Sequence, residues 1–165
     1  MSPGLVLRPA TPADGASVLR LIRGLADYER LLHEVTATEA TLQATLFGSL
    51  PHAHAVLAEV DDAAVGMALF YYTLSTFTLR RNIFLEDLFV EPDHRGRRIG
   101  LALMRYLARR AVEENCGRIE WRVLNWNQPS IDFYQRLGAR PIDDWHTKQL
   151  SGDALVALAE GATNG

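Results

Sequence analysis

The sequence has one cysteine, no long apolar run and no excess of basic residues, and each shortage excludes a class of protein. Cys116 has no partner for an intrachain disulfide, so we expect a reducing compartment. No apolar stretch approaches the roughly 18–20 residues of a membrane span, and the first residues lack the basic and apolar regions of a signal peptide. We therefore expect a soluble, cytoplasmic protein.

The charge balance argues against nucleic acid as the main partner. Seventeen Lys and Arg residues stand against twenty Asp and Glu residues, which gives a formal net charge of −3. Proteins that bind nucleic acid usually have a strong basic excess. The 165 residues are enough for one domain and too few for two cores. We predict one domain over residues 3–160 and a frayed tail over residues 161–165, with neither a nucleic-acid nor a membrane partner.

The apolar periodicity predicts an α/β (α+β) fold in which helices flank a mixed, mostly antiparallel sheet. Apolar residues recur at helical spacing through residues 18–25 and 99–114. Short turns between strand patterns, such as Asp61-Asp62, predict an antiparallel meander. The expected strands are 5–7, 55–60, 65–74, 83–90, 119–124 and 145–150, and the further helices begin near residues 36, 130 and 153. Thr36 with Glu39 fits a capping box, and Gly138 fits a left-handed helix end.

Residues 90–100 read Val-Glu-Pro-Asp-His-Arg-Gly-Arg-Arg-Ile-Gly and lead from a strand through a loop into a helix. The unpaired N–H groups of a helix N-terminus suit phosphate oxygens, glycine lets the backbone approach closely, and arginines add charge. The segment matches neither the P-loop nor the dinucleotide fingerprint. From these residues alone, a site for a pyrophosphate and a solvated basic helix start, with Arg98, Arg105 and Arg109 on its polar face, stay equally open.

Several motifs follow one another in an order and spacing that resemble one family. They are R-P-A-T-P-A-D at 8–14, L-R-L-I-R-G-L-A-D-Y-E at 19–29, F-L-E-D-L-F-V at 84–90, R-G-R-R-I-G at 95–100 and W-N-Q-P-S-I-D-F-Y-Q-R-L-G-A at 126–139. Together they resemble the GNAT superfamily of N-acetyltransferases, and within it the diamine (spermidine/spermine) acetyltransferases and the thialysine N-epsilon-acetyltransferases. The resemblance implies a GNAT-like fold, an acetyltransferase activity and acetyl-CoA as co-substrate.

The resemblance also implies which residues bind acetyl-CoA. They are Leu88, Phe89 and Val90 on the third meander strand, Arg95, Gly96, Arg97, Arg98, Ile99, Gly100 and Leu101 at the helix start, Glu120, Trp121 and Arg122 on the next strand, and Asn127 and Ser130. Arg98 replaces a glycine of the family signature, so its side chain is expected to point outward or onto a coenzyme phosphate. Asn127 and Ser130 also fit turn and N-cap positions.

Acetyl transfer to an amine needs a base, an oxyanion partner and an acid. A lysine-like ammonium has a pKa near ~10.4 and must lose a proton before it attacks, and the departing thiolate must gain one. The resemblance gives Glu86 the role of base and Tyr134 that of acid. It gives the role of oxyanion donor to a backbone N–H near Leu88, Phe89 or Val90. Strand alternation predicts that Glu86 and Asp87 face opposite sides and form no carboxylate pair. Edge-strand charges and a packed aromatic ring remain the alternatives for Glu86 and Tyr134.

The acceptor amine is expected to be small and cationic. The resemblance implies that Tyr28 and Glu29 contact the substrate, and the carboxylates of Glu34, Glu86 and Asp87 add negative charge. Relatives that act on polyamines have a denser acidic cluster after this pair, whereas residues 30–33 here are Arg-Leu-Leu-His. A diamine or polyamine and a thialysine-like amino acid therefore stay equally open. The family also implies a homodimer.

Other functions remain open from the sequence. They are a protein or peptide N-acetyltransferase, a non-catalytic acyl-CoA-binding module and, against the charge balance, a nucleic-acid binder. Cys116 has no histidine close to it in the sequence, so we expect direct transfer rather than an acyl-enzyme. The five histidines lack metal-binding spacing, so we expect no metal.

Overall fold

The computed structural model describes residues 4–161 and divides into two compact units. The first unit ends at Arg122 and the second begins at Val123. The single domain expected over residues 3–160 therefore stays a prediction. Apart from Gly161, the expected frayed tail lies outside the described residues.

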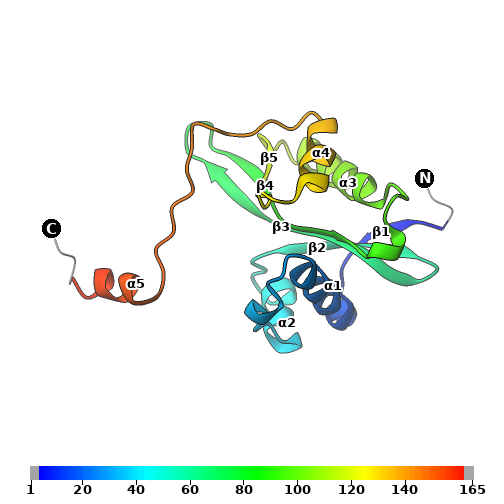
Figure 1. Cartoon of the computed structure of the whole chain (residues 1–165), viewed down its shortest axis with the longest axis horizontal. Helices are drawn as coiled ribbons and strands as arrows, with labels where there is room; N and C mark the ends of the chain where they lie inside the picture. Colours follow the sequence, from blue (N-terminus) through cyan, green and yellow to red (C-terminus); the bar gives the residue numbers. More distant parts are fainter. Residues whose placement is uncertain (1–3, 162–165) are drawn as a thin grey trace. The chain divides into compact units, whose positions relative to one another are not determined.

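The first unit is built on a five-stranded sheet whose strands lie side by side in chain order (Figure 1). The strands are β1 (Val6–Pro9), β2 (His54–Val60), β3 (Ala63–Ser75), β4 (Arg80–Val90) and β5 (Ile119–Trp121). The first four pair antiparallel, and β5 pairs parallel with β4. Asp61 and Asp62, with φ of 50° and 62°, form the tight turn between β2 and β3. The predicted mixed, mostly antiparallel sheet is confirmed.

Helices cover both faces of this sheet (Figure 1). On one face lie α1 (Gly15–Tyr28) and α2 (Glu39–Phe47), and on the other lies α3 (Ile99–Glu113). Three short 3-10 helices are η1 (Pro12–Asp14), η2 (Leu32–Glu34) and η3 (Pro92–His94). Val18 and Leu21 of α1 and Leu107 of α3 are fully buried, and each such side chain contributes about 1.5–3 kcal/mol. The apolar periodicity therefore located both long helices correctly.

The start of α2 differs from the prediction. The helix begins after Thr38, two residues beyond the expected cap at Thr36. Thr38 Oγ1 accepts a hydrogen bond from the Thr41 N–H at 3.2 Å, and Thr41 Oγ1 accepts one from the Thr38 N–H at 2.9 Å. The prediction was wrong because this reciprocal threonine pair satisfies the first N–H groups of the helix without Glu39.

The second unit contains α4 (Gln128–Arg136) and α5 (Gly152–Ala159). Gly138 follows α4 with φ of 85°, as its left-handed position predicts. The strand expected at residues 145–150 is wrong, because this described stretch is irregular backbone. An apolar pattern alone does not make a strand, since its backbone groups need a neighbouring strand to pair with. For the same reason the strand expected over residues 119–124 is only as long as its pairing with β4, which ends at Trp121.

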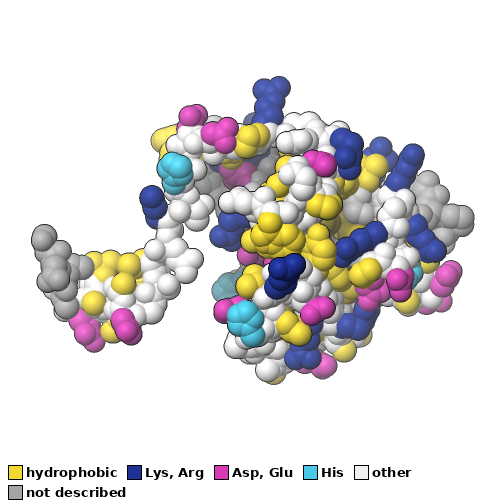
Figure 2. All heavy atoms as spheres, in the orientation of Figure 1, with side chains coloured by type: hydrophobic (Ala, Val, Ile, Leu, Met, Phe, Trp, Pro, Cys, Tyr) yellow, Lys and Arg dark blue, Asp and Glu magenta, His cyan; other side chains and the backbone are white. Residues whose placement is uncertain are grey.

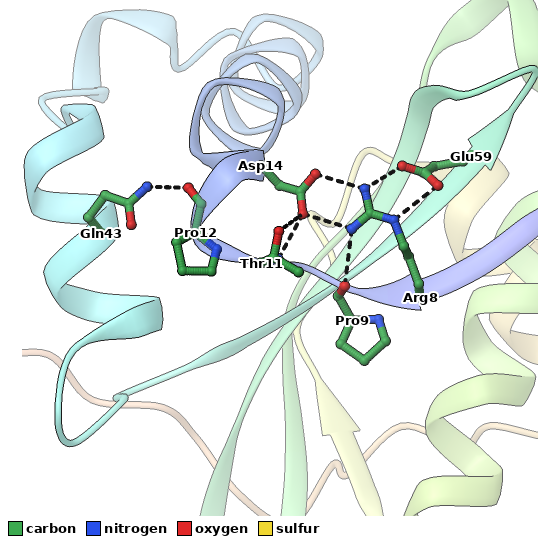
Figure 3. A network of polar contacts seen from close by, with 7 residues as sticks. All are labelled: Arg8, Pro9, Thr11, Pro12, Asp14, Gln43 and Glu59. Atoms are coloured by element: carbon green, nitrogen blue, oxygen red, sulfur yellow. Dashed lines mark hydrogen bonds and ion pairs between the residues drawn. The ribbon is translucent and has the colours of Figure 1, made fainter.

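The Arg8 side chain of β1 binds residues of β2 and of the segment that leads into α1 (Figure 3). Arg8 donates to both carboxylate oxygens of Asp14, at 2.7 and 2.8 Å, and to those of Glu59. Thr11 adds hydrogen bonds from its N–H and its hydroxyl to Asp14, at 2.7 and 2.8 Å. Two-pronged contacts of this kind are strong and fix geometry. The network therefore sets where α1 leaves the sheet, and with it the position of the far end of α1.

We expect Asp14→Asn to lower the free energy of unfolding by about 1–3 kcal/mol at pH 7, because charged hydrogen bonds to a shielded carboxylate are lost. The Arg8 guanidinium holds the pKa of Asp14 well below its usual range. A depressed carboxylate pKa stabilises the fold above the unfolded pKa near ~4, and this stability is lost as the pH falls below it. Urea unfolding should therefore show a difference in the free energy of unfolding between wild type and variant, and this difference should become smaller below about pH 4. Glu113→Gln, at an exposed residue of α3, is the control, and an equal effect of both variants would contradict the assignment.

Candidate active site

The middle of β4 carries a β-bulge at Glu86. Leu69 of β3 pairs with Asp87, whereas the next residue, Phe70, pairs with Leu85, so Glu86 has no partner in this register. A bulge inserts one extra residue into a strand and breaks the alternation of side chains there. Residues of β4 on either side of Glu86 therefore follow different alternation patterns.

The two faces of the sheet show this switch. Before the bulge, Leu85 pairs with Phe70, and the Arg110 Cζ of α3 lies 5.2 Å from the centre of the Phe70 ring. Beyond the bulge, Phe89 belongs to the apolar cluster that contains Val18 and Leu21 of α1. Leu85 and Phe89 are four residues apart in the strand and yet lie on opposite faces. Simple alternation would have put them on the same face.

The bulge also corrects the prediction for the two adjacent carboxylates. Asp87 pairs with Leu69, and Leu69 packs against the α1 cluster. Tyr71 packs against the same α1 cluster as Leu69. The pKa of Tyr71 is raised by burial and, next, by the negative charge of the Glu86 carboxylate, so Glu86 lies near Tyr71 on this face. The expectation that Glu86 and Asp87 face opposite sides is therefore wrong. They are neighbours on the face that α1 covers, because the extra residue cancels the alternation.

A third carboxylate comes from the end of α1. Burial, followed by the negative charges of Glu86 and Glu29, raises the pKa of Asp87 to about 6. Glu29 is the C-cap of α1, and burial raises its pKa too. Tyr28 is the last residue of the helix, so the predicted substrate pair Tyr28 and Glu29 is brought to the same region as Asp87. This concentration of negative charge can attract a cationic amine, and its carboxylates can accept a proton.

Glu86 itself is held by an arginine. Arg122 Nη2 lies 3.4 and 3.5 Å from the two oxygens of Glu86, and Arg122 Cζ lies 5.4 Å from the centre of the Phe84 ring. Both side chains are well exposed, so the pair contributes little to stability. Arg122, which the sequence assigned to acetyl-CoA, lies against the expected base.

β4 offers backbone donors beyond the end of β5. The pairing of β5 with β4 ends at Leu85 and Trp121. Glu91 donates its N–H to Val65 of β3 at 2.9 Å, and backbone groups alternate in direction along a strand. The N–H groups of Leu88 and Val90 consequently point away from β3, along the edge that β5 no longer covers. Such N–H groups can stabilise the negative charge that develops on a thioester oxygen.

The loop before α3 has an unusual backbone. Gly96 has φ of 76°, and Arg98, the N-cap of α3, has φ of 61°. Arg98 thus has the left-handed conformation that the glycine of the family signature adopts readily. For a residue other than glycine this conformation costs roughly 1–2 kcal/mol. Arg97 and Arg98 are exposed, whereas the Ile99 side chain is buried in the core. Ile99 can therefore contact a coenzyme only through its backbone.

Phe89, another predicted acetyl-CoA residue, also has its side chain in the core. It packs so tightly on α1 that a Cβ at Gly24 would lie 2.8 Å from the Phe89 ring. A Cβ at Gly66 of β3 would lie 2.9 Å from the Phe89 carbonyl oxygen. Two glycines thus set the spacing between α1, β3 and β4. The Phe89 side chain is therefore not available to a coenzyme, and its carbonyl oxygen faces Gly66 of β3.

The Arg95 side chain is exposed and lies against β4 and the end of α1. Its Nε donates to the Val90 carbonyl oxygen at 2.9 Å, and its Cζ lies 4.7 Å from the centre of the Tyr28 ring. The Phe89 ring centre is 5.7 Å from the same Cζ. Of the predicted coenzyme residues on β5, Glu120 forms an ion pair with Arg118 at 2.8 Å, and Trp121 pairs with Leu85.

The remaining predicted residues lie in the second unit. Asn127 is buried, and its Oδ1 accepts the Ser130 N–H at 3.4 Å, so Asn127 is the N-cap of α4. This confirms a structural role for Asn127 and leaves its coenzyme role a prediction. Tyr134 lies within α4, with its ring centre 5.2 Å from that of Phe133. Its role as acid stays a prediction as well.

Sequence reasoning missed the bulge, the Glu86–Arg122 contact and the position of Arg95. The residues around Glu86 are apolar on both sides of the strand, so their pattern does not show where the faces switch. The one available signal was the pair of adjacent carboxylates inside an apolar strand. Two neighbouring charges on one face of a sheet require a break in the alternation.

Other surface features point to no further site. On the face drawn in Figure 2, Lys and Arg side chains are interspersed with Asp and Glu rather than gathered in one basic band. Among residues 4–161, no three His, Cys, Asp or Glu side chains are grouped so that they could hold a metal ion. In the same part of the chain, every helix is too short or too polar to cross a membrane.

We expect Asp87→Asn to stabilise the protein by about 1–2 kcal/mol at pH 7.5, since it removes a shielded charge. The folded pKa of Asp87, about 6, lies above the unfolded value. The folded state therefore binds the proton more tightly, and stability falls as the pH rises from roughly 4 to 6. When urea unfolding is measured between about pH 4 and 6, the free energy of unfolding of the variant should not show this decline. Glu86→Gln, at a more exposed carboxylate, should change stability less. Parallel profiles for wild type and Asp87→Asn would contradict the burial of this charge.

Comparisons with known proteins identify the family of this chain. A sequence model of the acetyltransferase (GNAT) family matches residues 22–139. Thialysine N-epsilon-acetyltransferase of Sus scrofa is 37% identical over 166 residues, which cover 94% of this chain and 97% of that protein. L-ornithine N5-acetyltransferase NATA1 of Arabidopsis thaliana is 28% identical over 197 residues, with 92% of this chain and 86% of that protein covered.

The fold has a solved counterpart. An integron cassette protein from the mobile metagenome of V. cholerae matches with a TM-score of 0.81 and 25% identity, and the match covers 95% of this chain and 98% of that one. The resemblance inferred from the motifs is confirmed, because the family match spans well over half of the chain and the relatives align over nearly all of it. The chain belongs to the acetyltransferase (GNAT) family and is an N-acetyltransferase.

Proposed function

We propose that this enzyme transfers the acetyl group of acetyl-CoA directly to the primary amine of a small cationic acceptor, a thialysine-like amino acid or a diamine or polyamine. One observation carries the proposal: the bulge gathers the carboxylates of Glu86, Asp87 and Glu29 at the end of α1. The 37% identity to a thialysine N-epsilon-acetyltransferase supports it. Several carboxylates around one site favour an acceptor with two positive charges. One is the ammonium group that loses its proton and reacts, and the other stays bound to the carboxylates.

Acetyl-CoA supplies the activated acetyl group as a thioester. The residues present suit it: the N–H groups of Leu88 and Val90 lie along an uncovered strand edge, and the exposed Arg97 and Arg98 stand at the start of α3. Gly96 has no described atom within 4 Å of the position its Cβ would take, so the backbone there is open to a ligand. The arginines and the N-terminus of α3 would bind a diphosphate, and the strand edge would bind the thioester arm.

The proton transfers fall to two residues. Glu86 takes a proton from the acceptor ammonium, directly or through a water molecule, so that the neutral amine can attack. Arg122 holds the Glu86 carboxylate in place by their contact at 3.4 Å. Tyr134 gives a proton to the departing thiolate, since a phenol is a suitable acid for a thiol at neutral pH. The family resemblance supports both roles. We further propose that the enzyme works as a homodimer in the cytoplasm.

The proposal is tested by incubating the protein with acetyl-CoA and single amines while thiol release is measured. Thialysine, ornithine, spermidine and lysine-containing peptides form the panel. We expect turnover of at least one small amine and none of the peptides. Tyr134→Phe should reduce this turnover by about 10²–10⁴-fold, the usual contribution of a positioned acid, and leave acetyl-CoA affinity in calorimetry unchanged. Binding of acetyl-CoA without turnover of any amine would instead indicate a non-catalytic module.

We expect Glu86→Gln to lower kcat/KM and to shift its pH dependence upward. Without the carboxylate, the reaction relies on the small fraction of acceptor that is already neutral in solution, and this fraction grows with pH. The rate of thiol release should be followed from about pH 6 to 10 with a saturating acetyl-CoA concentration. A Glu86→Gln profile of unchanged shape would remove Glu86 from the role of base.

A further inference from the structure

The Phe84 ring, on the face of β4 that carries Glu86, contacts two further side chains. It stacks on the ring of Tyr71, its partner in β3, with the ring centres 5.2 Å apart and the ring planes inclined by 27°. The Cζ of Arg122 lies 5.4 Å from the centre of the Phe84 ring. Stacked rings and a guanidinium near a ring are both favourable arrangements. Phe84 therefore holds Tyr71 and Arg122 beside the bulge of β4.

The Glu86 carboxylate lies next to this group of side chains. Arg122 Nη2 is 3.4 Å from one of its oxygens. Burial and, next, the negative charge of Glu86 raise the pKa of Tyr71, the positive charge of Arg122 lowers it, and a hydrogen bond with Glu86 raises it. A carboxylate accepts hydrogen bonds and donates none, so the Tyr71 hydroxyl is the donor. Two donors, a guanidinium and a hydroxyl, thus meet at Glu86.

The next residue of β3 has partners of the same kinds on the opposite face. The Tyr72 hydroxyl donates to Glu114 Oε2 at 2.6 Å and accepts a hydrogen bond from Arg110 Nε at 2.9 Å. Arg110 and Glu114 also form an ion pair at 2.8 Å, at the end of α3. Adjacent residues of a strand face opposite sides. Of these two tyrosines, only Tyr71 lies beside the proposed base.

The Glu86 side chain needs support before it can act as a base. It is 39% exposed, and it belongs to the residue of the bulge that has no partner in β3. A long, exposed side chain samples several rotamers unless contacts restrict it. A base must lie within hydrogen-bond reach of the proton that it takes. The contacts of Tyr71 and Arg122 with Glu86 provide this restriction.

We propose that Tyr71 is a positioning residue for Glu86: its hydroxyl donates a hydrogen bond to the carboxylate and, together with Arg122, orients it toward the acceptor amine. The stack on Phe84 keeps the hydroxyl in place. This inference rests on the proposed function for the role of Glu86 as base. The competing interpretation is that Tyr71 is a packed aromatic residue whose hydroxyl takes no part.

The kinetic test compares Tyr71→Phe with Tyr72→Phe, using whichever of thialysine, ornithine and spermidine is turned over fastest. Tyr71→Phe keeps the ring and removes the hydroxyl, so kcat should fall about ten-fold, the size expected for one hydrogen bond to a charged group. The calorimetric affinity for acetyl-CoA should stay unchanged. Tyr72→Phe removes a hydroxyl that also binds a glutamate, and it should not change kcat. An equal kcat in wild type and Tyr71→Phe would overturn the inference.

A double variant separates positioning from a general structural effect. In the Glu86→Gln background, Tyr71→Phe should cause no further fall in kcat, because the group that Tyr71 positions no longer acts as a base. Effects of residues that act as a unit are not additive. A general structural effect would instead lower kcat by the same factor in both backgrounds, and this result would overturn the inference.

Tyrosine ionisation gives a readout that needs no substrate. The NMR signal of an isotope-labelled tyrosine ring changes as its hydroxyl ionises, and Tyr71→Phe identifies the signal of Tyr71. We expect Glu86→Gln to lower the pKa of Tyr71, because this variant removes the negative charge beside the hydroxyl. The other charges of this region, those of Arg122, Asp87 and Glu29, are the same in both proteins.

Glu114→Gln is the matched control for the titration. Burial and then the hydrogen bond with Glu114 raise the pKa of Tyr72, so this variant should lower the pKa of Tyr72 and leave that of Tyr71 unchanged. A Tyr71 titration that is identical in wild type and Glu86→Gln would overturn the inference whatever the enzyme acetylates. A shifted Tyr71 titration in a protein that acetylates no amine of the panel would support the contact and contradict the proposed function, so the two failures are distinct.

Discussion

The extra residue in β4 is the constraint on which the candidate site depends. Because Glu86 has no partner in β3, the strand changes face there, and Asp87 lies beside Leu69 under α1. The same change puts the Phe89 side chain into the α1 core. Without the bulge, Asp87 would point at α3 and the three carboxylates would not meet. One inserted residue thus creates both the charge of the site and its anchor.

The carboxylates that we propose for the acceptor site lower the stability of the protein. Burial, followed by the negative charges of Glu86 and Glu29, raises the pKa of Asp87 to about 6, so the charged form of Asp87 is disfavoured. Repulsion between Asp87 and the neighbouring carboxylates weakens the empty protein, and the cationic acceptor that we propose would relieve it. The Arg8 network and the apolar contacts of α1 supply the rigidity that holds these charges together.

The sequence predicted the elements that depend on local residue patterns. It did not predict the features that depend on which strand or side chain lies next to a residue in the fold. The periodicity of Val18 to Leu25 and the short turn at Asp61 located α1 and the meander. The faces of β4 could not be predicted, because Ile83 to Val90 offers apolar residues to both sides. The strand expected at residues 145–150 failed because pairing depends on another strand. Arg95 was assigned from its motif, and only the positions of Tyr28 and Phe89 show what its side chain touches.

The contact between Gly24 and Phe89 limits how this enzyme can change its choice of amine. Any side chain at position 24 would meet the Phe89 ring at 2.8 Å, and any at position 66 would meet the backbone of β4 at 2.9 Å. The two glycines therefore allow a close approach of α1, β3 and β4, and an outward shift of α1 would open the core that holds Phe89 and Val18. For the acceptor site that we propose, a change of specificity is therefore expected from exchanges of the last side chains of α1, on a scaffold whose spacing is already set.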